Sequence, residues 1–256
     1  MAGPVEINKN IEIDHSPRTA QTRVTMRVTP TRAGLGLLLF FTLAVVYHPA
    51  LRPGFTFAGM DFLNLLLPHA QLVRLSFAAG EWPLWNPYSW GGTPLLASMQ
   101  SGALYPLMWP FLPFRLAAVL PWFVLLHLTI AAGATAFLAR RVLGLGVWPA
   151  LLAGCVHAGG GFFLGHLEQV NTIAGIAWSA WVFTALLGIA DGWRLSLLLG
   201  GSACMAVLAG HPQYLALALL FGFPAGLLLA VCRTRSAAGA ARFTLFSLPP
   251  LVFAAG

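Results

Sequence analysis

The residues that could carry chemistry are few, and they lie in segments between long apolar runs. Asp61 opens an amphipathic stretch, and residues 80–92 read Gly-Glu-Trp-Pro-Leu-Trp-Asn-Pro-Tyr-Ser-Trp-Gly-Gly. A carboxylate at a helix start can cap free backbone N–H groups, and a positioned carboxylate can also accept a proton as a general base. The two roles do not exclude each other, and both stay open for Asp61.

Further polar side chains stand at the ends of later apolar runs. His166 and His211 each follow a glycine there. Either ring could satisfy a helix-end carbonyl, which is the simpler reading of one histidine taken alone. Because both fall at the same predicted level, a joint site also stays open. His127 and His157 lie deeper within apolar runs, where we expect hydrogen bonds between helices.

The composition places these groups in a membrane protein. Hydrophobic residues make up 58% of the chain and charged residues 8%, and the mean hydropathy is +0.79. This fraction of hydrophobic residues is higher than a soluble globular protein needs to form its core. The net charge of +7 comes from basic residues scattered between apolar runs, with no basic stripe, so the sequence argues against nucleic-acid binding.

The apolar runs predict an all-α polytopic protein with about six to seven transmembrane helices. A spanning helix needs roughly 20 apolar residues. The runs are Ala33–Tyr47, Leu116–Ala139, Val142–Leu164, Val170–Ala190, Leu195–Ala209 and Tyr214–Val231, with a seventh from Phe243. The third contains Gly159-Gly160-Gly161, so we expect a tilted or broken helix there.

The basic residues predict the orientation. With residues 1–32 as a basic cytoplasmic tail, alternating sides put 11 of the 14 basic residues inside, and only Arg52, Arg74 and Arg115 outside. This agrees with the positive-inside rule. The first outer loop, about residues 48–115, and the other outer segments then hold most of the polar side chains.

The first outer loop is too rich in aromatic and branched residues to be disordered. Residues 61–77 have apolar side chains at near-helical spacing, so we expect an interfacial helix, with a second one or a re-entrant turn near Gln100–Pro106. The Trp-rich segment is typical of an aromatic belt at the membrane boundary. Its density of rings, with Asn86 and Gly91-Gly92, also favours one fixed loop conformation.

Several chemistries lack their motifs. Cys155, Cys204 and Cys232 have no metal-type spacing, and the sequence contains neither HExxH nor a GxxxxGK nucleotide loop. We therefore predict no metal and no direct use of ATP.

The outer residues resemble those of the bacterial YfhO-type membrane proteins, within the GT-C superfamily of polyprenyl-phosphate-dependent glycosyltransferases. The resemblance covers most of residues 34–256. It rests on Asp61, Gly80–Tyr88, Gly91–Pro94, Gln100–Gly102, Tyr105-Pro106, Gly165-His166 with Gln169 and Asn171, and Gly210–Gln213. Many superfamily members have paired acids where this chain has Met60-Asp61-Phe62. Family members are also longer, so we expect this chain to be the N-terminal part of a larger protein.

The resemblance implies a lipid-linked sugar donor, a cell-envelope acceptor and a bacterial cytoplasmic membrane with the N-terminus inside. Asp61 would be the catalytic base, with the polyprenyl-phosphate sugar as a substrate and no bound cofactor. The substrate-binding candidates are Arg74, Trp85, Asn86, Gln100, His166, Gln169, Asn171, His211 and Gln213. The amides Gln169, Asn171 and Gln213 could equally bridge helices.

Two other classes stay open. A transporter or lipid flippase would use broken helices and buried ionisable groups at midspan, which Gly159-Gly160-Gly161 and His157 fit in part. A non-catalytic scaffold would use the aromatic loop to bind a partner.

Glu168 could pair with His166 or with Arg115. The sequence leaves the sugar, the acceptor and the oligomeric state open.

Overall fold

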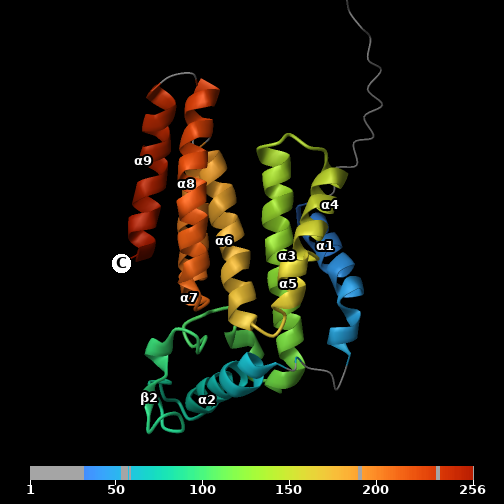
Figure 1. The fold of residues 1–256 in the computed structure, drawn as a ribbon, viewed down its shortest axis with the longest axis vertical. Helices are drawn as coiled ribbons and strands as arrows, with labels where there is room; N and C mark the ends of the chain where they lie inside the picture. The colour runs from blue at the N-terminus through green and yellow to red at the C-terminus, as the bar shows by residue number, and fades with distance from the viewer. Residues whose placement is uncertain (1–31, 53–56, 58, 190–191, 235–236, 256) are drawn as a thin grey trace, which may run out of the picture. The chain divides into compact units, whose positions relative to one another are not determined.

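The structure, a computed structural model, describes residues 32–52, 57, 59–189, 192–234 and 237–255, all within the compact unit Thr31–Gly256. The expected basic tail lies outside these residues, apart from Arg32. The described chain is mostly helical, and its long helices run along one another as a bundle (Figure 1). The elements are α1 (Arg32–Val46), α2 (Leu67–Ala78), α3 (Leu116–Arg141), α4 (Val147–Ala158), α5 (Gly161–Gly165), α6 (Val170–Gly188), α7 (Trp193–Leu208), α8 (Pro212–Thr234) and α9 (Ala237–Ala255).

Four helical segments are long and apolar enough to cross a membrane: Leu116–Arg141, Val147–Gly165, Val170–Gly188 and Pro212–Thr234. Two shorter apolar helices cover Gly34–Val46 and Trp193–Leu208. The expectation of an all-α membrane protein is thus confirmed in its coarse form, whereas the number of spans stays a prediction. The expected break in the third run is present, since α4 ends at Ala158 and α5 begins at Gly161.

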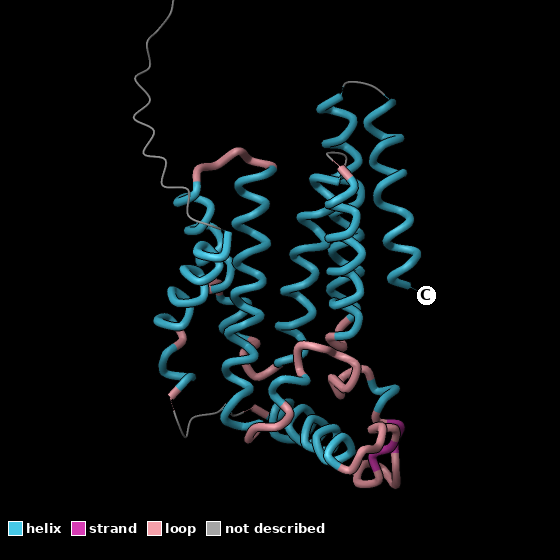
Figure 2. Tube along the Cα trace, turned by 180° about the vertical axis from the view of Figure 1, so that it is seen from behind, coloured by secondary structure: helices cyan, strands magenta, loops and turns pink. Residues whose placement is uncertain are grey.

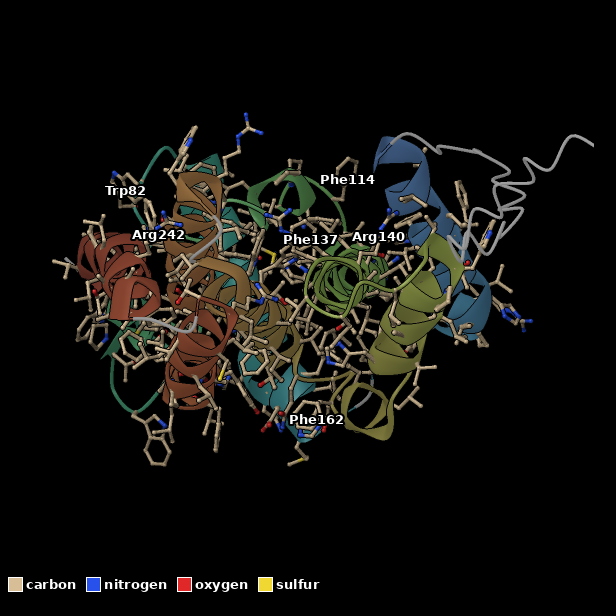
Figure 3. The ribbon with its side chains drawn as sticks, turned by 90° about the horizontal axis from the view of Figure 1, so that it is seen from above. Trp82, Phe114, Phe137, Arg140, Phe162 and Arg242 are labelled. Carbon is tan, nitrogen blue, oxygen red and sulfur yellow. The ribbon has the colours of Figure 1, made fainter. Side chains whose placement is uncertain are left out.

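Helix α3 is the centre of the bundle. It contacts α1, α4 and α6, while α6 also contacts α7 and α8, and α9 packs on α7 and α8. A view along the helices shows α3 between the side formed by α1 and α4 and the side formed by α6 to α9 (Figure 3). Buried side chains form two apolar clusters. One surrounds α3, and the other is formed by side chains of α6, α7, α8 and α9.

Small residues set the spacing between α3 and α4. Ala131, Ala132 and Ala134 of α3 are fully buried, and a Cβ added at Gly154 of α4 would lie 2.5 Å from the Ala132 carbonyl oxygen. Lipid supplies no hydrophobic force between helices, so close backbone approach through small residues is the main source of packing energy.

The long segment between α1 and α3 forms the end of the bundle that carries most of the polar groups. It holds the 3₁₀ turns His48–Leu51, Leu96–Ser98 and Trp109–Phe111, the π-helical turn Phe62–Leu66, α2, and the antiparallel strands β1 (Trp85–Asn86) and β2 (Thr93–Pro94). Helix α2 lies across the end of the bundle, and the hairpin lies at the same end (Figures 1 and 2). We call this the site end.

The helix expected over residues 61–77 is confirmed, because helical structure runs from Met60 to Ala78. Of the two alternatives for Gln100–Pro106, the helix is wrong, and whether the turns found there re-enter the membrane stays a prediction. That stretch is a chain of turns, in which Tyr105 N–H donates to the Gly102 carbonyl at 3.1 Å. Gly102 has φ of +67°, a conformation that ends a helix readily, and Pro106 follows closely.

Replacing Gly154 by Ala should destabilise the protein by about 1–3 kcal/mol, because the new methyl group would press on the α3 backbone. The matched control is Gly201→Ala in α7, where a Cβ would meet no atom within 4 Å. Thermal unfolding in detergent, followed by circular dichroism, should give a lower midpoint for Gly154→Ala alone. Equal midpoints for both variants would contradict the close α3–α4 contact.

Candidate functional site

Asp61 is not a helix cap. Its backbone is already helical (φ −67°, ψ −39°) and its side chain makes no capping hydrogen bond. The helix starts two residues earlier, where the Gly59 carbonyl accepts a hydrogen bond from Leu63 N–H at 3.0 Å. The exposed Asp61 carboxylate instead accepts a hydrogen bond from Gln169 Nε2, with 3.0 Å to Oδ2. The group therefore faces a partner from a distant part of the chain.

A π-helical turn follows Asp61 and has a local cause. Pro68 carries no N–H, and its ring would crowd the carbonyl four residues earlier, so the chain widens over Phe62–Leu66. Phe62 is fully buried within this turn and meets Phe57 edge-on at 5.9 Å between ring centroids. The buried ring fixes the start of the helix and with it the direction of the Asp61 side chain.

Gln169 belongs to the short connection between α5 and α6. Its N–H donates to the His166 carbonyl at 2.8 Å, which shapes a tight turn. The preceding residue, Glu168, places its carboxyl group where a side chain of residue 59 would lie, so a larger residue at that position would displace this carboxyl group. Glu168 Oε2 is buried and has no hydrogen-bond partner among the described residues. The structure thus puts Glu168 at Gly59 rather than against His166 or Arg115.

His211 lies between α7 and α8, next to the same cluster. Gly210 adopts φ of +93° and packs on the Met99 carbonyl, and the His211 Cβ rests against Gly175 of α6. Burial lowers the pKa of His211, whereas a hydrogen bond with Gln213 and the charge of Asp61 act in the opposite direction. The ring is therefore mainly neutral at pH 7 and can both donate and accept hydrogen bonds.

His166 lies three residues before Gln169, in the connection between α5 and α6. Its Nδ1–H donates to the Phe162 carbonyl at 2.7 Å, and its ring stacks on Phe162 at 4.2 Å. One nitrogen thus satisfies a helix-end carbonyl, as the simpler reading expected, while Nε2 is left as an acceptor. Tyr214 has its ring centroid 6.3 Å from both Phe162 and His211, so aromatic rings connect the two histidines.

Of the other two amides in the predicted set, Asn171 links two elements of the fold and Gln213 does not. Asn171 is buried and its Nδ2 donates to the Gln100 backbone carbonyl at 2.6 Å, which ties the first loop to the start of α6. This supports the bridging alternative for Asn171. Gln213 is exposed at the start of α8, beside His211.

Trp85 and Asn86 belong to the hairpin and not to the Asp61 cluster. Asn86 is 2% exposed, its Oδ1 accepts from Tyr88 N–H at 2.9 Å, and its Nδ2 donates to Ser89 Oγ at 3.0 Å. The Asn86 amide is thus hydrogen-bonded within its own loop, so we remove Asn86 from the candidate substrate-binding residues. Arg74 lies half-buried on α2, and its predicted binding role stays a prediction.

Of the two deeper histidines, His157 makes the expected hydrogen bond between helices, whereas His127 bonds within α3 and to the first loop. His127 Nδ1–H donates to the Phe123 carbonyl at 2.7 Å, and Tyr105 OH donates to His127 Nε2 at 2.5 Å. Trp178 Nε1–H donates to the same tyrosine oxygen at 2.6 Å. His157 contacts Thr135 Oγ1 at 2.5 Å across the α3–α4 interface. Tyr105 thereby anchors the first loop on α3 and α6, a role that no pattern in the sequence indicates.

The cluster is thus Asp61, Gln169 and His211, flanked by Glu168, His166, Phe162 and Tyr214. Among the described residues, no group of three or more histidine, cysteine or acidic side chains could hold a metal ion. Protein-family models, curated proteins and solved structures gave no match to this chain.

The burial of His211 predicts a pH dependence of stability. A lowered pKa in the folded state means that the unfolded chain binds more protons below its ordinary value of about 6.5. The free energy of unfolding should therefore be highest above that pH and fall as the pH drops through the lowered pKa. His69 of α2, whose pKa burial also lowers, acts in the same direction.

The measurement is the unfolding midpoint in detergent between about pH 7.5 and pH 5.5 for the wild type and for His211→Gln. The variant should show a smaller loss of stability over this range, because one proton-linked group is gone. An unchanged slope would mean that His211 is not buried as described.

Proposed function

We propose that this protein is a membrane glycosyltransferase of the YfhO type, within the GT-C superfamily. It would move a sugar from a polyprenyl phosphate to a cell-envelope acceptor. The observation that carries the proposal is the hydrogen bond from Gln169 to Asp61 at 3.0 Å. It joins an exposed carboxylate of the first loop to a second polar segment at the same end of the bundle. A carboxylate held at the polar end of an apolar bundle suits a reaction that takes place at the membrane surface on a lipid-borne substrate.

In the proposed reaction Asp61 is the general base. Gln169 occupies Oδ2, so Oδ1 is left to take the proton from the acceptor hydroxyl. The acceptor oxygen then bonds to the anomeric carbon while the bond from that carbon to the phosphate oxygen breaks. The electron pair leaves with the polyprenyl phosphate, and the configuration at the anomeric carbon inverts.

The neighbouring rings suit the remaining tasks. The neutral imidazole of His211 can donate a hydrogen bond to the departing phosphate, and His166 Nε2 can accept one from a sugar hydroxyl. Phe162 and Tyr214 offer ring faces between these two histidines, 6.3 Å apart at their centroids. No step in this scheme requires a metal ion.

The basic residues support an outward-facing site. Arg140 and Arg141 end α3, Arg194 begins α7 and Arg233 lies near the end of α8, all at the end opposite α2. By the positive-inside rule that end is cytoplasmic. We propose a bacterial cytoplasmic membrane with the cluster on its outer face.

The transporter alternative gains little support from these contacts. The helix break at Gly159 and Gly160 fits it, but His157 is engaged with Thr135, and the polar cluster lies at one end of the bundle. A scaffold role is separated from catalysis only by an activity test.

Replacing Asp61 by Asn should greatly slow sugar transfer while keeping the fold, because the Asn carbonyl can still accept the hydrogen bond from Gln169. Loss of a positioned base should lower the rate by about 10²–10⁴-fold. The control is Glu81→Gln, which removes an exposed carboxylate of the same loop and should leave the rate unchanged.

The assay supplies membranes containing the full-length protein with radiolabelled polyprenyl-phosphate sugars, at equal protein levels, and scores label in the acceptor. Equal transfer by wild type and Asp61→Asn would exclude Asp61 as the base. No transfer by either protein across a panel of donors would favour the transporter or scaffold.

A further inference from the structure

The hairpin formed by residues 82–94, which we call the aromatic hairpin, presents an unusual surface. The exposed fractions of its large apolar side chains are high, at 60% for Trp82, 57% for Trp85, 83% for Tyr88 and 98% for Trp90. Leu84 is 60% exposed between them. Exposed aromatic patches of this kind mark contact with a partner or a membrane.

The chain holds these rings in a fixed arrangement. Trp90 has φ of +54°, a strained conformation for a residue with a side chain. The turn around it is closed by Gly92 N–H, which donates to the Ser89 carbonyl at 2.8 Å, and the hairpin is closed by Leu95 N–H on the Leu84 carbonyl at 2.9 Å. The Trp85 ring packs against Gly92. The outward direction of Trp90 is therefore built into the loop.

The sequence around the hairpin excludes charge. Between Glu81 and Arg115 no acidic or basic residue and no histidine occurs. Beyond the hairpin, Met99, Leu104, Trp109 and Phe114 are also exposed. A loop that faced bulk water or a charged partner would carry charged side chains at such positions, whereas the boundary between lipid headgroups and acyl chains selects neutral aromatic and aliphatic residues.

The polar groups of the hairpin suit the membrane boundary. The Asn86 amide is held within the loop, since its Oδ1 accepts from Tyr88 N–H and its Nδ2 donates to Ser89 Oγ. The exposed tryptophan and tyrosine rings each carry a single N–H or O–H group, as rings at the level of the lipid headgroups do. What the hairpin offers outward is therefore mainly ring and aliphatic surface with a few polar edges.

We propose that the aromatic hairpin inserts into the lipid–water boundary of the membrane face at the site end. In the view along the helices, Trp82 and Phe114 lie at the outer edge of the molecule, where lipid surrounds a membrane bundle (Figure 3). The anchored hairpin continues directly from α2, so it holds the loop that carries Asp61 at the level of the headgroups. This inference rests on the surface of the hairpin and does not depend on the proposed reaction.

Spin labelling tests the depth of the hairpin. The full-length protein, with Cys155, Cys204 and Cys232 replaced by Ala, receives one nitroxide label at Trp90→Cys and is reconstituted in phosphatidylcholine and phosphatidylglycerol vesicles. The label should collide more with oxygen, which concentrates in lipid, than with a water-soluble nickel chelate. A label at Glu81→Cys, at the base of the hairpin, should show the reverse order.

A second label position guards against a local effect of replacing Trp90. Tyr88→Cys should give the same lipid-exposed result, since Tyr88 is exposed on the same hairpin. Access of both labels to the nickel chelate, equal to that at residue 81, would overturn the proposal. Spin–spin broadening between copies, or immobilisation of the labels only when soluble cell-wall glycan is added, would overturn it too.

Discussion

The hydrogen bond between Gln169 and Asp61 is the contact on which the site depends. It joins two segments separated by 108 positions in the chain, with 3.0 Å between Nε2 and Oδ2. The bond forms only because the buried Phe62 and the π-helical turn fix one partner, while the tight connection between α5 and α6 fixes the other. Each side of the pair is thus positioned by its own local packing, and His211 is placed beside it by the contacts of Gly210 and Gly175.

The membrane explains why these polar groups share one end. Lipid cannot satisfy backbone or side-chain hydrogen bonds, so the long apolar helices exclude such groups from their lipid-facing surfaces. Several of those that remain inside are paired, as with His127 on Tyr105 and Thr135 on His157. The first loop can then be irregular because it packs on the helix ends, where Asn171 and Tyr105 fasten it to α6 and α3.

The sequence predicted the helices well and the contacts poorly. The sequence pattern located α1, α3, α6 and α8, the helix after Asp61 and the break at Gly159, because each depends on local composition. Whether Asp61 caps the helix or is left as an available carboxylate stayed open, since both roles are compatible with an aspartate at the start of a helical stretch. Glu168 against Gly59, Asn86 bound within its own hairpin and Tyr105 as an anchor all depend on tertiary packing, which no spacing in the sequence reveals.

Cysteine cross-linking measures the central contact most directly. In a protein whose three native cysteines are replaced by Ala, Asp61→Cys with Gln169→Cys should be joined rapidly by a short bifunctional thiol reagent in membranes. Leu143→Cys with Gln169→Cys is the control, because Leu143 lies in the connection between α3 and α4 at the opposite end of the bundle. Cross-linking of the first pair alone is the predicted result. Failure of the first pair under conditions where both thiols react with a maleimide would contradict the site described here.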